Sequence, residues 1–260
     1  MAIETLFLLF FTGLAGGIIT ALAGGSSLIT FPALIAVGLP PIIANATIFV
    51  TVLPANMSAA FAYKHELQKL KPVIWHLGVA SLAGGIVGSV LLLQMSNAGF
   101  ASLLPWLLLT ATLLLAFGRK LKSAFARTNV SKHPEAQSDS QSMTGLILIF
   151  VISVYGGFFG AGLGVLMLAV LSLIGYDTYH EANALKNTFN AGIGFLGILL
   201  FGAFGLISWP HAAVLTIGST FGAYLAVRVS HRVNAGLLNK AMIVIGFTLS
   251  AYYFWIEFGS

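Results

Sequence analysis

Apolar runs of about twenty residues recur along this chain, and they constrain its fold more than any other feature. Each run is long enough to cross the ~30 Å hydrocarbon core of a bilayer as a helix. A soluble protein is excluded because 58% of the residues are hydrophobic and 7% are charged, whereas soluble domains carry about a quarter charged residues. The sequence therefore predicts an all-α integral membrane protein.

The apolar runs form two sets separated by one polar segment. The first set covers 3–22, 26–38, 42–63, 72–95 and 99–118, and the second covers 143–160, 163–175, 181–205, 209–228 and 235–257. We expect eight to ten hydrophobic helical elements. The segment between the sets is basic and rich in Ser and Gln, so it is too polar to bury. The predicted organisation is a first membrane repeat (1–118), a cytoplasmic polar loop (119–142) and a second membrane repeat (143–260).

Short matches in the same order support a duplication of the first set into the second. The segment Ala23 to Leu28 lies before Val37-Gly38 as Gly160 to Val165 lies before Ile174-Gly175. The pair Gly84-x-x-x-Gly88 likewise matches Gly218-x-x-x-Gly222, and small residues four apart favour close helix contacts. An internal repeat explains the shared order, and independent compositional similarity is the alternative.

Basic residues indicate the orientation of the chain. They gather in the central segment, between the third and fourth elements, and around the start of the last element. In the latter two places they are Lys64, Lys69, Lys71, Arg228, Arg232 and Lys240. Because basic loops stay in the cytoplasm, these three loops are predicted to be inside and both termini outside. The two repeats are then inverted. The first run follows Glu4 and no basic residue, so we interpret it as a retained membrane segment rather than a signal peptide.

A glycine-rich turn precedes the short second element of each repeat. The residues are Gly24, Gly25, Ser26 and Ser27 in the first repeat and Gly160, Gly162 and Gly164 in the second. Glycines free the backbone, serines are expected to cap the following helix, and the free amides at a helix start attract an anion. Broken helices at matching places favour a substrate site, and close packing or a surface turn is the alternative.

A second set of candidate binding residues follows each turn. It comprises Asn45 and Thr47 in the first repeat and Lys186, Asn187 and Thr188 in the second, with Thr51, Asn56, Asn183 and Asn190 nearby. Polar residues are costly in hydrocarbon and usually face a bundle interior or a cavity. Lys186 would supply charge for an anion, whereas snorkelling to the interface and helix capping are the alternatives. Asp177 and Glu181 are weak candidates for ion coupling.

Other classes of site lack support in the sequence. There is no cysteine, the six histidines are scattered, and no nucleotide-binding motif is present, so we expect no metal, no cofactor and no catalytic residue. His76 and His211 match between the repeats and are interpreted as interfacial, with a proton relay as the alternative. Orientation in the membrane explains the net charge of +5 better than binding of nucleic acid.

Several of these segments resemble those of a known family, the sulfite exporter TauE/SafE family of membrane permeases. The similarity is carried by Gly13-x-x-Gly16-Gly17, Ala23 to Leu28, Phe31 to Leu34, Ala44 to Thr47, Gly156 to Gly164 and Lys186 to Thr188. The resemblance implies export or uptake of small anions such as sulfite, sulfonates and carboxylates, driven by ion gradients. This chain departs from the family's more usual alanine-small-threonine-serine pattern at Asn45-Ala46-Thr47 and Lys186-Asn187-Thr188. It also lacks the cysteines of thiosulfate-handling relatives, which disfavours thiosulfate as a substrate.

The sequence thus predicts a secondary transporter of small anions that works by alternating access. Its expected partners are the anion, the lipid bilayer and a coupling ion, H⁺ or Na⁺; a homodimer is a candidate assembly, and a bacterial inner membrane is the expected location. A passive anion channel, a membrane enzyme and an assembly factor are the alternatives. A channel needs a continuous polar lining, and an enzyme needs clustered catalytic groups.

Overall fold

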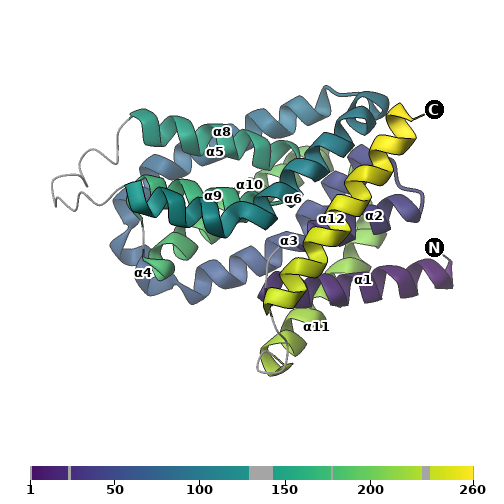
Figure 1. The fold of residues 1–260 in the computed structure, drawn as a ribbon, viewed down its shortest axis with the longest axis horizontal. Coiled ribbons are helices and arrows are strands. Elements are labelled where there is room, and N and C mark those ends of the chain that lie inside the picture. The colour runs from purple at the N-terminus through teal and green to yellow at the C-terminus, as the bar shows by residue number, and fades with distance from the viewer. Residues whose placement is uncertain (1, 23–24, 129–142, 177, 230–234, 260) are drawn as a thin grey trace.

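The computed structural model describes residues 2–22, 25–128, 143–176, 178–229 and 235–259, and these contain helices and no strand. The helices of the first half are α1 (Ile3–Leu22), α2 (Ser27–Ala36), α3 (Pro41–Ala62), α4 (Lys64–Lys69), α5 (Lys71–Leu93) and α6 (Asn97–Thr128). Those of the second half are α8 (Met143–Phe158), α9 (Leu163–Leu173), α10 (Tyr179–Ala203), α11 (Trp209–Val229) and α12 (Ala235–Phe258). Figure 1 shows them as one bundle.

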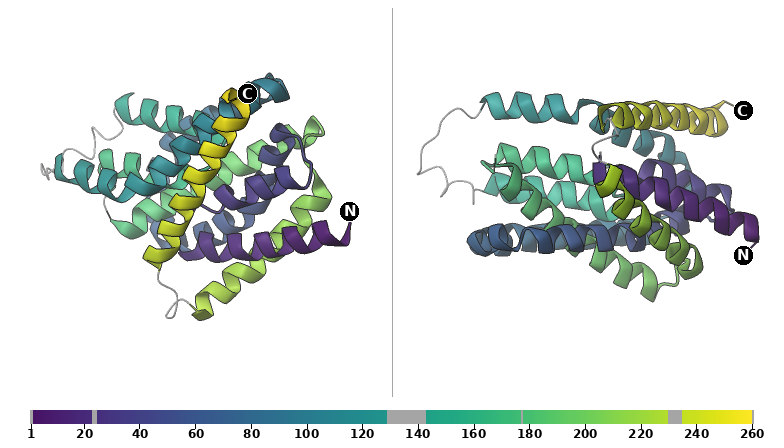
Figure 2. Two further views of the ribbon diagram at one scale, coloured as in Figure 1. Left: turned by 45° about the vertical axis from the view of Figure 1, so that its right-hand side comes forward. Right: turned by 90° about the horizontal axis from the view of Figure 1, so that it is seen from below.

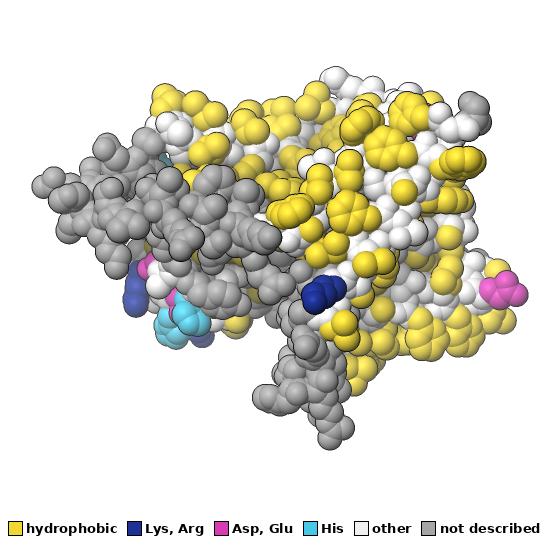
Figure 3. All heavy atoms as spheres, in the orientation of Figure 1, with side chains coloured by type: hydrophobic (Ala, Val, Ile, Leu, Met, Phe, Trp, Pro, Cys, Tyr) yellow, Lys and Arg dark blue, Asp and Glu magenta, His cyan; other side chains and the backbone are white. Residues whose placement is uncertain are grey.

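Six helices of the described residues, α1, α3, α5, α6, α10 and α12, are long and apolar enough to cross a membrane. Shorter apolar helices, α2, α8 and α9, lie between them. Hydrophobic side chains also cover the outer face of the bundle seen in Figure 3. Water would disfavour so much exposed apolar surface, whereas lipid does not. The prediction of an all-α integral membrane protein is confirmed.

Helices of opposite halves interlock. The most extensive contacts are α1 with α11 and α5 with α8, while α3 packs on α10 and α6 on α12. This pattern of contacts is unchanged when the helices of the two halves are exchanged in chain order, so that α1, α2, α3, α5 and α6 are replaced by α8, α9, α10, α11 and α12, respectively, and the reverse. Such exchange is what two related repeats would produce, and the division into repeats stays a prediction from the sequence. The halves are not separate bundles, because each completes the packing of the other.

Glycines set the closest of these contacts. In the α1–α11 pair, a Cβ atom at Gly13 would lie 2.5 Å from the carbonyl oxygen of Leu215, and one at Gly222 would overlap the carbonyl oxygen of Leu14. In the α5–α8 pair, a Cβ atom at Gly88 would overlap the carbonyl oxygen of Val154. Only glycine permits such approach, so the prediction that the glycine pairs four residues apart form helix contact faces is confirmed.

Both chain ends lie at one end of the bundle, whereas α8 begins at the opposite end (Figure 1). The further views in Figure 2 agree, since the N and C labels stay on the same side of the molecule after each rotation. This arrangement is the one expected if the chain crosses the membrane between its N-terminus and the start of α8. Which end faces the cytoplasm stays a prediction from the basic loops.

Two helices differ from the expectations drawn from sequence. Helix α6 continues to Thr128, beyond the expected end of the fifth element at residue 118 and into the segment predicted to be a loop. Its sequence there is rich in Arg, Lys and Ala, which are good helix formers, and the backbone hydrogen bonds of a helix do not require burial. A short helix, α4, also lies between α3 and α5, where no element was expected.

Candidate functional site

The chain breaks between α1 and α2 and again between α8 and α9, as the glycines predicted. Gly25 has φ +86°, and Gly160 and Gly162 have φ +75° and +77°. These left-handed conformations are accessible to glycine and strained for other residues. The second break is therefore a tight turn that depends on two glycines, Gly160 and Gly162. The first break contains one such glycine, Gly25, directly before Ser26. Gly24 lies outside the described residues.

The expected serine cap is absent. Ser26 lies at the N-cap position of α2 with right-handed helical angles (φ −55°, ψ −26°), and its side chain makes no capping hydrogen bond. Side-chain caps need an extended N-cap residue, so the prediction was wrong. Instead, the Ser26 carbonyl accepts hydrogen bonds from the N–H groups of Ile29 and Thr30, each at 3.0 Å. The hydroxyl of the buried Ser26 therefore takes no part in capping α2.

Both breaks pack against the same stripe of α6. A Cβ atom at Gly25 would lie 3.5 Å from Leu115 Cδ1, and one at Gly162 would lie 3.5 Å from Ala111 Cα. Ala111 and Leu115 are one helical turn apart, and both are buried. The two breaks, which are more than a hundred residues apart in the chain, therefore converge within one turn of a single helix. This convergence was expected for broken helices that share a site.

Lys186 and Asn190 gather at the second break. A Cβ atom at Gly164, the second residue of α9, would lie 3.7 Å from Lys186 Cδ and 3.8 Å from Asn190 Nδ2. The Lys186 ammonium donates to Asn183 Oδ1 at 3.1 Å, while Asn190 Oδ1 is buried without a hydrogen-bond partner. Among the described residues, the Gly164 N–H donates to no acceptor. A cation, a side-chain amide and a helix start thus meet in one place.

The polar residues of α3 bind the second break and the loop before α11. Asn45, 1% exposed, donates from Nδ2 to the carbonyl of Phe158 at 2.9 Å, which fixes the end of α8. Thr47 Oγ1 donates to the Ile43 carbonyl at 2.6 Å and accepts the N–H of Ser208 at 3.1 Å. Asn45 therefore holds the backbone at the second break, and Thr47 holds the loop before α11. Neither caps the start of α3.

Asn187 and Thr188 do not contact the breaks through a hydrogen bond among the described residues. The hydroxyl of Thr188 donates to the Ala184 carbonyl of its own helix at 2.8 Å, and Asn187 is buried within α10. Such back-bonding satisfies a hydroxyl inside an apolar bundle without any partner helix. Their assignment to the site stays a prediction from sequence alone.

The weak candidates for ion coupling do not join Lys186. Glu181 Oε2 accepts a hydrogen bond from the Thr178 hydroxyl at the start of α10, and no ion pair between Glu181 and Lys186 exists in the described part of the chain. Asp177 lies outside the described residues. His211 Nδ1 lies 2.6 Å from Ser208 Oγ, whereas His76 Nδ1 contacts the Pro72 carbonyl of its own helix at 2.8 Å. The matched histidines therefore have different surroundings.

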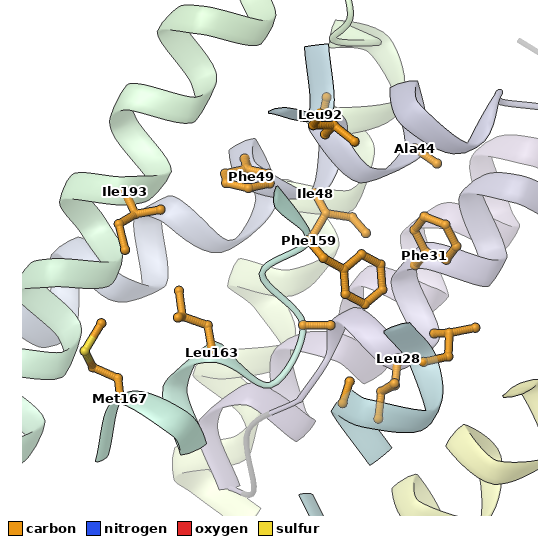
Figure 4. Close-up of a cluster of buried hydrophobic side chains, with 14 of the residues drawn as sticks. Leu28, Phe31, Ala44, Ile48, Phe49, Leu92, Phe159, Leu163, Met167 and Ile193 are labelled. Carbon is orange, nitrogen blue, oxygen red and sulfur yellow. The ribbon is translucent and has the colours of Figure 1, made fainter. Parts of the chain in front are cut away.

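Aromatic side chains fill the space between the breaks. The ring of Phe159, 4% exposed, lies in the second break and meets the ring of Phe31 of α2 at 5.9 Å between centroids. It also meets Phe100 of α6 and Tyr155 of α8, at 6.3 and 6.4 Å. Figure 4 shows Phe159 directed toward Phe31 and Leu28. Phe159 thus packs the second break against α2, α6 and α8.

The sequence did not indicate Phe31 and Phe159 as candidate functional residues. Both lie in the segments that carry the family resemblance, but an aromatic residue in an apolar run carries no signal of its own. Asn190 was noticed only as a polar residue of α10. Its position on Gly164 follows from the packing of α10 on α9, which no local pattern encodes.

Replacing Asn45 with leucine is expected to lower the thermal stability of the protein. Leucine keeps the branched shape of the side chain and leaves the part-buried Phe158 carbonyl without its donor, which costs about 1–3 kcal/mol. Thermal unfolding in detergent measures the effect. The control is Asn56→Leu, since the Asn56 amide donates only to Val52 of its own helix. Equal unfolding temperatures for the two variants would show that the bond to Phe158 contributes nothing.

Comparison with known proteins identifies relatives over nearly the whole chain. The family model described as sulfite exporter TauE/SafE matches residues 9–253. A probable membrane transporter protein of Haemophilus influenzae is 28% identical over 96% of this chain and 95% of its own length. Similar proteins from Sinorhizobium sp. and Escherichia coli K12 (YfcA) are 26% and 27% identical over 96% and 94% of this chain, and over 92% and 87% of their own lengths. No solved structure matches.

Proposed function

Because the chain belongs to the sulfite exporter TauE/SafE family and is a multi-pass membrane transporter, we propose that it carries small anions, such as sulfite, sulfonates or organic acids, by alternating access. The observation that carries the proposal is the convergence of the two glycine breaks on Ala111 and Leu115 of α6, with Lys186 packed on the start of α9. No enzymatic activity is proposed.

An anion at the second break would meet three favourable groups. The Gly164 N–H is a free donor at the positive end of α9, the Asn190 amide lies beside it, and Lys186 adds a full charge. Asn183 holds the ammonium in place until an anion competes for it. At the first break, the buried Ser26 hydroxyl is the corresponding polar group, so the charged half of the site belongs to the second repeat.

The contact between Phe31 and Phe159 supports a closed state in the proposed cycle. These rings join α2 to the first residue of the second break, so their separation would open a path between the halves. Symmetric pairing of the halves offers two equivalent ways of opening, one toward each side of the membrane. In the proposed orientation, within a bacterial inner membrane, the central segment is cytoplasmic and both termini are outside. A coupling ion, H⁺ or Na⁺, and a homodimer belong to the same proposal.

Flux measurements in sealed liposomes test the mechanism. Purified protein is reconstituted, and uptake of labelled sulfite or a small sulfonate is followed with and without an imposed proton or sodium gradient. A secondary transporter accumulates the anion above the external concentration when the driving gradient is present. Equilibration that never exceeds the external concentration under any gradient would instead identify a passive channel.

A ligand screen tests the substrate class independently of flux. Protein in detergent is heated with sulfite, sulfonates, sulfate or small carboxylates, and the unfolding temperature is compared with that in chloride. A ligand at one hundred times its Kd stabilises the folded state by about 2.7 kcal/mol. Stabilisation by none of the four classes would contradict the proposed anion site.

Replacing Phe159 with alanine is expected to accelerate anion flux by removing the ring that closes the space between the breaks. The cavity destabilises the protein by about 3–5 kcal/mol, so the unfolding temperature is measured alongside flux. Phe117→Ala is the control, because Phe117 is half exposed on the outer face of α6. Flux that falls in proportion to folded protein would rule out a gating role for Phe159.

A further inference from the structure

Two apolar grooves lie on the outer face of the bundle, one beside each glycine crossing. The larger encloses about 540 Å³ between α5 and α8 and is lined by Trp75, His76, Val79, Ala80, Ala83, Leu146, Ile147 and Phe150. The smaller encloses about 340 Å³ between α1 and α11 and is lined by Ile3, Leu6, Phe7, Phe10, Val214 and Ile217. Helices α5 and α8 take the places of α11 and α1 when the two halves of the chain are exchanged. The lining and charge of the two grooves are therefore compared directly.

Both grooves arise from the same geometry. Helices α5 and α8 run in the same direction, because Gly84 meets Phe150 and Gly88 meets Val154, one turn further along each helix. The helices touch backbone to backbone at this crossing. Their N-terminal turns, which carry the larger side chains Trp75 and Ile147, line the groove on the outer face. In a bilayer, lipid acyl chains contact the outer face of the protein, so an acyl chain is the group that occupies such an apolar groove.

The two grooves differ in charge. Lys71, Trp75, Val79 and Ala83 are spaced four residues apart on α5, so the exposed Lys71 lies on the groove face one turn before Trp75. Lys69 precedes it, and residues 64–71 contain three lysines and one glutamate. At the corresponding end of the other groove, Glu4 lies beside Ile3 and there is no lysine or arginine in the first turn of α1.

We propose that the groove between α5 and α8 binds an anionic phospholipid at a specific site. One acyl chain lies on Val79, Ala83 and Ile147, and the phosphate is bound by Lys71 and Lys69 at the membrane interface. The indole of Trp75, 75% exposed, lies between the acyl chain and the phosphate. This is the depth of the lipid ester groups, at the membrane interface where tryptophan is enriched. The groove between α1 and α11 is expected to take any lipid chain, since the first turn of α1 carries Glu4 and no lysine or arginine.

Quenching of Trp75 fluorescence by lipids with brominated acyl chains tests the proposal. The chain has four tryptophans, so the variant W106F/W209F/W255F retains only Trp75. It is reconstituted into phosphatidylcholine vesicles that contain brominated phosphatidylglycerol or brominated phosphatidylcholine at the same mole fraction. The proposal expects an apparent preference for phosphatidylglycerol of about fivefold per lysine involved.

Matched variants separate a built site from general surface charge. A variant that retains only Trp209, at the start of the corresponding helix α11, is expected to show no preference between the two lipids. K69A/K71A is expected to abolish the preference at Trp75. Ala83→Phe fills the groove while keeping both lysines, and it is expected to reduce the preference as well. Elution as a single species in detergent establishes that each variant is folded.

Three results would overturn the proposal. Equal quenching of Trp75 by the two lipids would show that the groove does not select a headgroup. The same preference at Trp75 and Trp209 would show a property of the vesicle rather than of the groove. A preference that Ala83→Phe leaves unchanged would show that the lysines attract lipid without the groove.

Discussion

Replacing Gly222 with valine is expected to prevent α1 and α11 from packing and to reduce the yield of folded protein severely. A Cβ atom at this position would overlap the carbonyl oxygen of Leu14 and lie 2.9 Å from Leu14 Cα. Both clashing atoms belong to the backbone of another helix, so no side chain can move aside. Overpacking costs about 1–3 kcal/mol even where side chains can adjust, and we expect at least 3 kcal/mol here.

The measurement is thermal unfolding of purified protein, together with yield from the membrane fraction. For a chain of this size, 3 kcal/mol lowers the unfolding temperature by about 6–12 °C. Gly88→Val is expected to behave alike, because the backbone of α8 lies at the corresponding distance. The control is Gly78→Ala in α5, since a Cβ atom there makes an ordinary contact of 3.7 Å with Phe189. An unfolding temperature of Gly222→Val within 2 °C of that of Gly78→Ala would refute the glycine crossing.

Replacing Lys186 with methionine is expected to lower anion flux by about ten- to a hundredfold while the protein stays folded. Methionine keeps the length of the side chain and removes its charge, and a hydrogen bond to a charged group contributes about 1.5–3 kcal/mol. The folded protein itself does not need this charge, because a part-buried ammonium with one amide partner gains little from burial. The unfolding temperature without anion is therefore expected to stay unchanged or to rise.

Two further variants sharpen the interpretation. Lys186→Arg keeps the charge and is expected to retain part of the flux, although its planar guanidinium differs in shape from an ammonium. Lys64→Met removes a lysine that lies over the ring of Phe61, at 5.3 Å from its centroid, and is expected to leave flux unchanged. Full flux in Lys186→Met, or anion stabilisation equal to that of the parent protein, would remove Lys186 from the site.

The elements of the fold were largely predictable because their causes are local. An apolar run must form its backbone hydrogen bonds within itself in lipid, so its length gives the helix. Gly25, Gly160 and Gly162 interrupt those runs, and the structure places left-handed turns there. Helix α6 was predicted too short because its end depends on helix propensity rather than on hydrophobicity.

The serine caps and the contents of the site were not predictable in this way. Ser26 has the right residue type for a cap, but the entry of the chain into α2 gives it helical angles and removes the capping geometry. Asn45 was assigned to the site by its polarity, and it proves to hold the end of α8. The role of Asn45 depends on a segment that is more than a hundred residues away.

The amino-acid sequence alone determined that this protein is a helical membrane protein, where its helices break, and which residues bear charge within them. The tertiary structure decided which helices pair, that both breaks meet on Ala111 and Leu115, and that Phe31 and Phe159 fill the space between them. The physical reason is that lipid is as apolar as the interior of the bundle. Hydrophobic periodicity then does not distinguish the buried face of a helix from its lipid-facing side, so only packing reveals it.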